Sequence, residues 1–331
     1  DAAELYRDYF TSHAAYYRGP VGDPRNPVPE GLKRLVASIH QCITGVGDAL
    51  DAMGRDLANL ARLLGPGLRG RWYNGHWPDR FDGFYDRGYL PGKPSFRAAV
   101  REAQHGGRNT AAPYIQGSVA LYYPMEIDRI EHPTAVNIGA VESGLLQEDG
   151  APRLVLGFAH PQIMECPRAP WWRRHMPTEV EGVVRATGAR GIYVDYFQWS
   201  APCYSDCHDH APGGGPFYVQ GKLDLIRDIQ ERVAAMPDGP GVLEVSSELT
   251  GGVAFTRECH LMFQDIYIQA GSLGKPMRAV PLFRMVCDNV KMSCILGPAG
   301  EFSKGMSFAC WDITNRTLTF GQVPGFGSSL A

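Results

Sequence analysis

Short apolar runs alternate with helix-like stretches along most of the chain from residue 70 onward. Helical spacing of apolar residues is clearest at 95–103, 178–186 and 219–233. Strands that alternate with helices form parallel sheets. Eight runs have the character of strands: 69–74, 109–115, 153–160, 191–197, 241–247, 260–267, 278–286 and 305–312. The pattern therefore predicts an α/β fold.

The first part of the chain, residues 1–66, has a helical pattern. One apolar stripe recurs at spacings of three and four, formed by Leu50, Met53, Leu57, Leu60 and Leu64. We expect an N-terminal helical segment over residues 1–66, packed on the outside of a larger domain. A coiled coil that binds a partner is the alternative.

The number and order of the strands favour a (β/α)8 TIM barrel over residues 67–331. An open, doubly wound sheet is the alternative, but no GxGxxG or GxxxxGK[ST] motif follows any strand. The chain stops soon after a strand-like run, without a closing helix. We therefore expect that the barrel is truncated at its C-terminus.

Composition excludes several classes of protein. The 331 residues are 44% apolar with a formal charge of −3, so nothing favours a nucleic-acid or anionic-membrane partner. No apolar run is long enough to span a membrane. The opening DAAELYRDYF shows no export signal. The eight cysteines are scattered through a chain too long to need a disulfide framework. Composition leaves the oligomeric state open.

Two carboxylates are the candidate catalytic groups. In a barrel, side chains alternate inward and outward along each strand, and active sites lie at the carboxyl ends of the strands. This alternation places Asp195 inward near the end of one strand and Glu248 at the mouth of the next. A retaining glycosidase needs two carboxylates about 5–5.5 Å apart, one as nucleophile and one as acid/base. We assign these roles to Asp195 and Glu248.

Two further acidic residues are supporting candidates. Glu244 lies on the same face as Glu248 in the middle of its strand, where an orienting role is expected. Asp265, near the end of the sixth strand candidate, competes for the role of second carboxylate. The alternative for Asp195 is a structural role, and the alternative for Glu248 is a loop cap or an ion pair with an arginine.

The loop after Asp195 is a candidate substrate loop, in which His208 and His210 are expected to contact sugar. A second interpretation is zinc, because thiolates and imidazoles are its usual ligands and Cys203 and Cys207 lie close by. The spacing matches no standard zinc motif, so no metal and no cofactor are expected here.

The six tryptophans map to one rim of the predicted barrel. Flat aromatic rings at a mouth suit the apolar faces of sugar rings. With the two histidines, the expected substrate contacts are Trp72, His76, Trp77, Asp82, Tyr114, Gln116, Trp172, Tyr193, Trp199 and Trp311.

Several motifs resemble a bacterial family of barrel proteins among the glycoside hydrolases. This family is related to the endo-α-N-acetylgalactosaminidases and, more distantly, to the α-galactosidase clan. The matching pieces are His76-Trp77, Phe81-Asp82, Pro113-Tyr-Ile-Gln-Gly117, Met164-Glu-Cys-Pro167 before Trp171-Trp172, Gly191-Ile-Tyr-Val-Asp195, Pro202-Cys-Tyr204, His208-Asp-His210, Gly213-Gly-Gly215 and Glu244-Val-Ser-Ser-Glu248.

The resemblance implies an Asp nucleophile at Asp195 and a Glu proton donor at Glu248. The α-galactosidase clan would instead favour Asp265 as acid/base. The resemblance also slightly favours a secreted or periplasmic location.

The sequence thus predicts a glycoside hydrolase that cleaves an α-linked glycan with retention. A non-catalytic carbohydrate-binding barrel is one alternative. A zinc-dependent hydrolase built on Cys203, Cys207, His208 and His210 is the other.

Overall fold

The computed structural model describes residues 2–15, 17–20, 22–27, 29, 32, 35–41, 69–74, 94–104, 110–117, 119–121, 135–155, 162–195, 197, 200–248, 258–264, 292–295 and 323–327.

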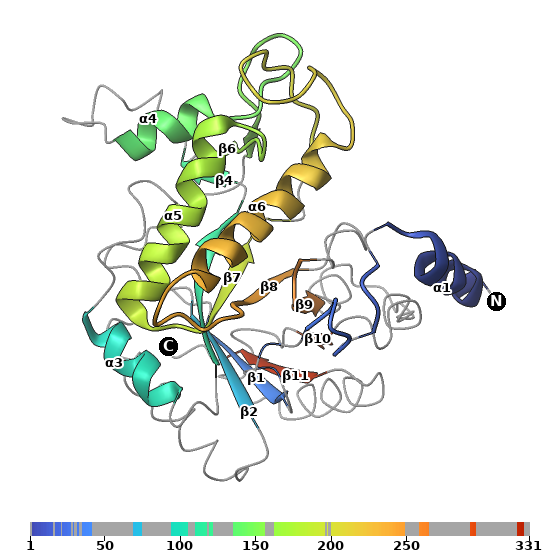
Figure 1. The fold of residues 1–331 in the computed structure, drawn as a ribbon. Coiled ribbons are helices and arrows are strands. Elements are labelled where there is room, and N and C mark those ends of the chain that lie inside the picture. The colour runs from blue at the N-terminus through green and yellow to red at the C-terminus, as the bar shows by residue number, and fades with distance from the viewer. Residues whose placement is uncertain are drawn as a thin grey trace, which may run out of the picture.

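Eight strands pair side by side in a closed order, β1-β11-β10-β9-β8-β7-β3-β2 (Figure 1). Every pairing in this order is parallel. All eight carboxyl ends therefore lie on one side. The strands are β1 Leu35–Gln41, β2 Arg69–Asn74, β3 Thr110–Gln116, β7 Gly191–Asp195, β8 Glu244–Glu248, β9 Leu261–Gln264, β10 Met292–Ile295 and β11 Val323–Gly327.

The helices are α1 Ala2–His13, α3 Pro94–Ala103, α4 Ala135–Glu142, α5 Pro170–Thr187 and α6 Phe217–Ala234. Helix α5 precedes β7 and α6 follows it, and the two pack side by side (Figure 1). Proline suits the first turn of α5, where its missing N–H is not needed. Gly188 ends that helix with a left-handed φ of 74°.

The hydrophobic core lies between these two helices and the strands. Val180, Val184 and Ile226 are completely or almost completely buried, together with Ile192 and Val245 from β7 and β8. Apolar residues covered by helices explain why β7 reads as a continuous apolar run. An ion pair joins Arg173 of α5 to Asp228 of α6, and a second joins Arg168, just before α5, to Asp224 of α6.

A small antiparallel sheet is inserted between β3 and α5. It consists of β4 Val119–Leu121, β6 Gln162–Met164 and β5 Leu154–Val155, in that order. The sequence pattern predicted a strand of the main sheet at 153–160, and this prediction is wrong for the part that the structure describes. Residues 154–155 instead pair antiparallel with β6, through Leu154 beside Ile163 and Val155 beside Gln162.

Five of the predicted strands agree with the structure, namely β2, β3, β7, β8 and β9. The predicted strands at 278–286 and 305–312 lie outside the described residues, whereas β10 and β11 were not predicted. The helices predicted at 95–103, 178–186 and 219–233 fall on α3, α5 and α6.

Residues 35–41 were expected in a helical segment but form β1, which pairs with both β2 and β11. The predicted boundary at residue 66 between the helical segment and the barrel therefore falls between β1 and its partner strands. The apolar stripe from Leu50 to Leu64 lies outside the described residues.

Among the helices in the described part of the chain, none combines the length and the hydropathy needed to cross a bilayer.

Candidate active site

Asp195 lies at the carboxyl end of β7, as the sequence predicted, and is partly exposed to solvent. Its carbonyl oxygen accepts a hydrogen bond of 2.9 Å from the amide of Gly117, which follows β3. In the parallel register Gln116 stands beside Asp195, and Tyr114 stands beside Tyr193. The ends of β3 and β7 are therefore joined at the level of the candidate nucleophile.

The register of β7 with β8 sets the level of the second carboxylate. Tyr193 stands beside Ser246, and Val194 stands beside Ser247. One further step along both strands brings Asp195 level with Glu248, which itself stands beside Phe263 of β9. Residues level with each other on adjacent parallel strands lie on the same face, with backbones about 4.8 Å apart.

Glu244 is fully buried at the start of β8. It lies beside Gly191, where an added Cβ would come within 3.1 Å of the Cβ of Glu244. Glycine at position 191 therefore makes room for this carboxylate. Two residues further along β8, the hydroxyl of Ser246 donates a hydrogen bond of 3.0 Å to the carbonyl oxygen of Ile192 and so links β8 to β7.

Lys222 of α6 is a buried residue near the site that sequence reasoning missed. Its ammonium group donates to the carbonyl oxygen of Phe197, two residues beyond Asp195. Its nitrogen also lies 4.6 Å from the centre of the Tyr218 ring and 5.1 Å from that of Phe197. Burial lowers the pKa of Lys222 well below its usual range. The sequence did contain a signal for this residue, because Lys222 lies among the apolar residues that form the buried face of α6.

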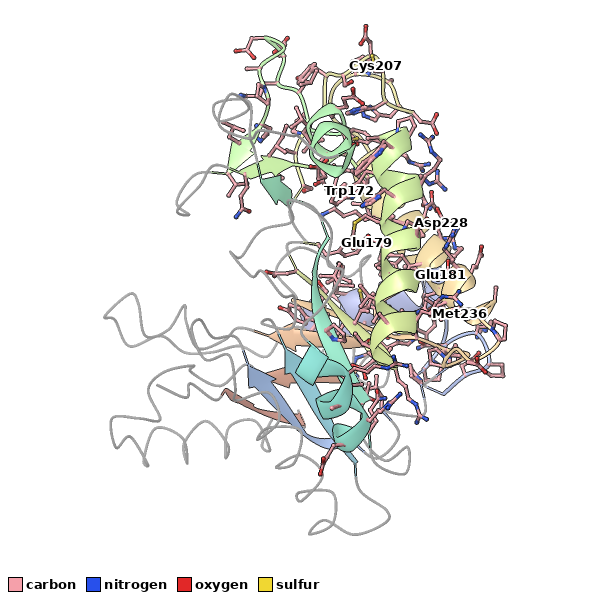
Figure 2. The ribbon with its side chains drawn as sticks, turned by 90° about the vertical axis from the view of Figure 1, so that its left-hand side faces the viewer. Trp172, Glu179, Glu181, Cys207, Asp228 and Met236 are labelled. Atoms are coloured by element: carbon pink, nitrogen blue, oxygen red, sulfur yellow. The ribbon has the colours of Figure 1, made fainter. Side chains whose placement is uncertain are left out.

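His208 and His210, on the loop between β7 and α6, come together with Cys203 of the same loop and with Cys166, which lies between β6 and α5. Cys203 Sγ lies 3.4 Å from His208 Nδ1, and Cys166 Sγ lies 3.3 Å from His210 Nε2. Cys207 is exposed at the tip of the loop (Figure 2), where its thiol donates to Asp206. The group that the structure brings together therefore differs from that of the zinc interpretation, because it contains Cys166 and leaves out Cys207.

Trp172 does not lie on a rim. It belongs to α5 (Figure 2) and has none of its surface exposed. It is part of the same buried hydrophobic cluster as Ile163 and Met176. The prediction failed because the helix begins at Pro170, so that Trp172 falls on the inner face of a helix rather than in a loop. Tyr193 is also buried, with 2% of its surface exposed.

Of the remaining candidates for substrate contact or catalysis, the structure describes only some. Trp72 of β2 stands beside Ile39 of β1 and Ala111 of β3. The other candidates lie outside the described residues: His76, Trp77, Asp82, Trp199, Asp265 and Trp311.

Relatives of this chain are named as glycoside hydrolases, as the motifs indicated. A protein of Bacteroides thetaiotaomicron named "Putative glycoside hydrolase" is 23% identical over 270 residues, covering 78% of this chain and 34% of its own length. "Putative glycoside hydrolase 22789" of Monosiga brevicollis is 27% identical over 179 residues, covering 51% of this chain and 14% of its own length. The chain spans about a third or less of these curated relatives.

Solved structures of two glycosidases are similar in fold. Ligand-free α-N-acetylgalactosaminidase NagBb from Bifidobacterium bifidum has a TM-score of 0.68 at 16% identity, over 99% of this chain and 53% of that one. The α-galactosidase from Thermus thermophilus in complex with stachyose has a TM-score of 0.58 at 10% identity, over 98% of this chain and 65% of that one.

A family model described as a domain of unknown function, DUF6259, matches residues 1–294. This match covers most of the chain, including Asp195, the β7–β8 pair and the cysteine–histidine cluster. The chain therefore belongs to the DUF6259 family.

Proposed function

We propose that this chain is the catalytic (β/α)8 TIM barrel of a glycoside hydrolase that cleaves an α-linked glycan with retention. Asp195 is the nucleophile and Glu248 is the acid/base in this proposal. The register that sets Asp195 level with Glu248 on adjacent strands carries it. The names of the relatives and of the solved structures of similar fold support the class of reaction and the α-linkage.

The architecture fits a (β/α)8 barrel because eight of the described strands pair in parallel and in a closed order. Helices α3, α5 and α6 each connect one strand to the next along the ring, from β2 to β3, from β3 to β7 and from β7 to β8. In such barrels the catalytic residues come from the carboxyl ends of several strands. Asp195 and Glu248 both occupy such an end.

The spacing of the strands favours retention over inversion. Carboxyl groups about 5–5.5 Å apart serve a retaining glycosidase, whereas an inverting one needs about 6.5–9.5 Å to admit water between them. Adjacent strands are about 4.8 Å apart, so an Asp and a Glu level with each other across that gap can bring their carboxyl groups to the shorter separation.

The proposed reaction has two steps. The Asp195 carboxylate attacks the anomeric carbon while the glycosidic bond breaks and Glu248 gives its proton to the leaving oxygen. Glu248, now a carboxylate, then takes a proton from water, whose oxygen attacks the anomeric carbon and releases Asp195. Glu244 is proposed to orient the site from its buried position, and Asp265 remains the alternative acid/base.

The experiment compares hydrolysis of aryl α- and β-glycosides by the wild type, Asp195→Asn and Glu248→Gln. We expect turnover of an α-glycoside, with the α-anomer released first by NMR, and a fall of at least about a thousandfold in kcat for Asp195→Asn. Azide added to Glu248→Ala should restore cleavage of an activated glycoside as the α-glycosyl azide. Asp238→Asn, the same change at an exposed carboxylate between α6 and β8, is the matched control.

Two outcomes contradict the proposal. Wild-type turnover that survives Asp195→Asn excludes this residue as the nucleophile. A wild type that binds sugar in calorimetry but turns over none of the glycosides indicates a non-catalytic binding barrel instead.

A further inference from the structure

Four metal-binding side chains meet where the loop after β7 touches the segment before α5. Their ligand atoms, the sulfurs of Cys166 and Cys203 and one ring nitrogen each of His208 and His210, all lie within 4.8 Å of one another. Cys166, Cys203 and His208 are buried and His210 is partly buried. Among the described residues this is the one group of its kind.

Each sulfur faces a different imidazole. Cys203 Sγ lies 3.4 Å from His208 Nδ1, and Cys166 Sγ lies 3.3 Å from His210 Nε2. With metal–sulfur bonds of about 2.3 Å and metal–nitrogen bonds of about 2.0–2.1 Å, ligand atoms around one tetrahedral ion are separated by distances of this size. A small contraction of the cluster is enough to bring all four onto one ion.

Backbone carbonyls select the tautomer of both histidines. His208 Nε2 lies 3.2 Å from the carbonyl oxygen of Glu142, and His210 Nδ1 lies 2.8 Å from that of Ala211. A carbonyl oxygen only accepts, so these nitrogens carry the hydrogens and donate them. The other nitrogens, His208 Nδ1 and His210 Nε2, are left with lone pairs directed at the sulfurs. Ligating histidines in metalloproteins are oriented by the same kind of outer hydrogen bond.

The surrounding structure holds the four side chains in place. The amide of Cys166 donates to the carbonyl oxygen of Ser143 at 2.9 Å. Cys203 and Gly213 exchange backbone hydrogen bonds of 2.9 and 2.7 Å. These bonds join the two ends of the segment that contains both histidines. The His210 ring stacks on Phe217 with centroids 3.8 Å apart.

We propose that Cys166, Cys203, His208 and His210 form a structural zinc site that fastens the β7–α6 loop to the segment between β6 and α5. Two thiolates and two imidazoles are a ligand set that zinc prefers. Four protein ligands fill its tetrahedral shell and leave no position for water, so the ion stabilises the structure rather than acting in hydrolysis. The site replaces both the sugar-contact interpretation of these histidines and the zinc-hydrolase alternative.

The ion would tie together the starts of two helices that are distant in sequence. Cys166 precedes α5, and His210 precedes α6. Cys166 belongs to the connection from β3 to α5 and His210 to the connection from β7 to α6, so the site would fix the loop that follows Asp195 against the segment between β6 and α5. The proposal does not depend on the proposed hydrolase activity, because it concerns metal content and loop stability alone.

The experiment measures zinc in the reduced, purified full chain by plasma mass spectrometry, after removal of loosely bound metal and readdition of zinc. We expect about one zinc per chain in the wild type and near zero in Cys203→Ser and His208→Ala. Cys207→Ser is the matched control and should keep its zinc, because Cys207 is an exposed cysteine of the same loop outside the cluster.

A second measurement keeps the proposal testable even where a variant fails to fold. Cobalt substituted into the wild type should give the visible absorption of a tetrahedral ion with thiolate ligands. Chelation should expose the loop at 203–215 to proteolysis, and zinc should reverse that exposure. A wild type that takes up no zinc or cobalt, loss of the metal in Cys207→Ser equal to that in Cys203→Ser, or a Cys166–Cys203 disulfide in the native protein overturns the proposal.

Discussion

The amide of Gly117 donates to the carbonyl oxygen of Asp195 at 2.9 Å, so the first residue beyond β3 holds the last residue of β7. A side chain at position 117 would have no room. An added Cβ would lie 2.3 Å from Cγ1 of Val194 and 3.0 Å from the Asp195 oxygen itself. Glycine here allows the two strand ends to approach each other beside the candidate nucleophile.

We therefore expect Gly117→Ala to separate the ends of β3 and β7. Overpacking of this kind costs about 1–3 kcal/mol in the free energy of unfolding, and under the proposed function kcat falls as well. Urea unfolding and a glycosidase assay measure the two effects. Gly214→Ala is the control, because an added Cβ meets nothing within 4 Å there. Equal stability of the two variants would contradict the close approach.

The burial of Trp172 makes a prediction that distinguishes a core residue from a sugar platform. Trp172→Ala should lower the free energy of unfolding by about 3–5 kcal/mol, as is usual for a large buried aromatic residue. Trp171→Ala, at the neighbouring and only partly buried position, should cost less. Thermal and urea unfolding provide the comparison. Unchanged stability of Trp172→Ala with lost sugar binding would place the residue at a binding surface after all.

Lys222 predicts a dependence of stability on pH. Its lowered pKa means that the unfolded chain binds this proton more tightly than the folded protein does. Stability should therefore rise with pH between the lowered folded pKa and the ordinary value of about 10.4. Lys222→Met removes this contribution, so its stability should rise less steeply than that of the wild type in urea unfolding from about pH 6 to pH 9. Parallel pH profiles for the two proteins would refute the assignment.

Glu181 predicts a rise of stability with pH as well, but at acid pH. Hydrogen bonds from Arg185 and Arg232 lower the pKa of this carboxyl on α5, which lies on the outer side of the two helices (Figure 2). Its contribution to stability is present above the unfolded pKa of about 4.3 and is lost as pH falls through the folded pKa.

Glu181→Gln should cost at most about 1 kcal/mol at neutral pH, because the pairs lie near the surface. The difference from the wild type should vanish below the folded pKa, as measured by chemical unfolding at each pH. Glu231→Gln, an exposed carboxylate of α6, serves as control. A difference that persists at low pH would mean that the ion pairs are not its source.

The features that sequence patterns predicted well are those with local causes. Strand β7 is an apolar run of four residues followed by a carboxylate, and β8 alternates Glu244, Ser246 and Glu248 with apolar or small residues. Helix α6 has its apolar residues at helical spacing. Each of these signals can be read without knowledge of the rest of the chain.

The features that were missed depend on contacts between distant residues. Cys166 joins His210 across 44 positions of sequence, which no spacing rule for zinc motifs covers. Residues 154–155 form a strand whose sheet is decided by β6, and β1 is defined by its partners β2 and β11. Trp172 was misplaced because counting from a strand end does not reveal where the next helix begins.

Strand β1 pairs with β11, so the first and the last strands of the ring are neighbours. During synthesis β1 has no partner on that side until residues 323–327 have left the ribosome, and closure is a late step that spans most of the chain. A product cut short before β11 would keep β1 and β10 as two unpaired edges, which invite pairing between molecules. Premature termination near the C-terminus should therefore yield aggregates, even though it removes none of the carboxylates at the ends of β7 and β8.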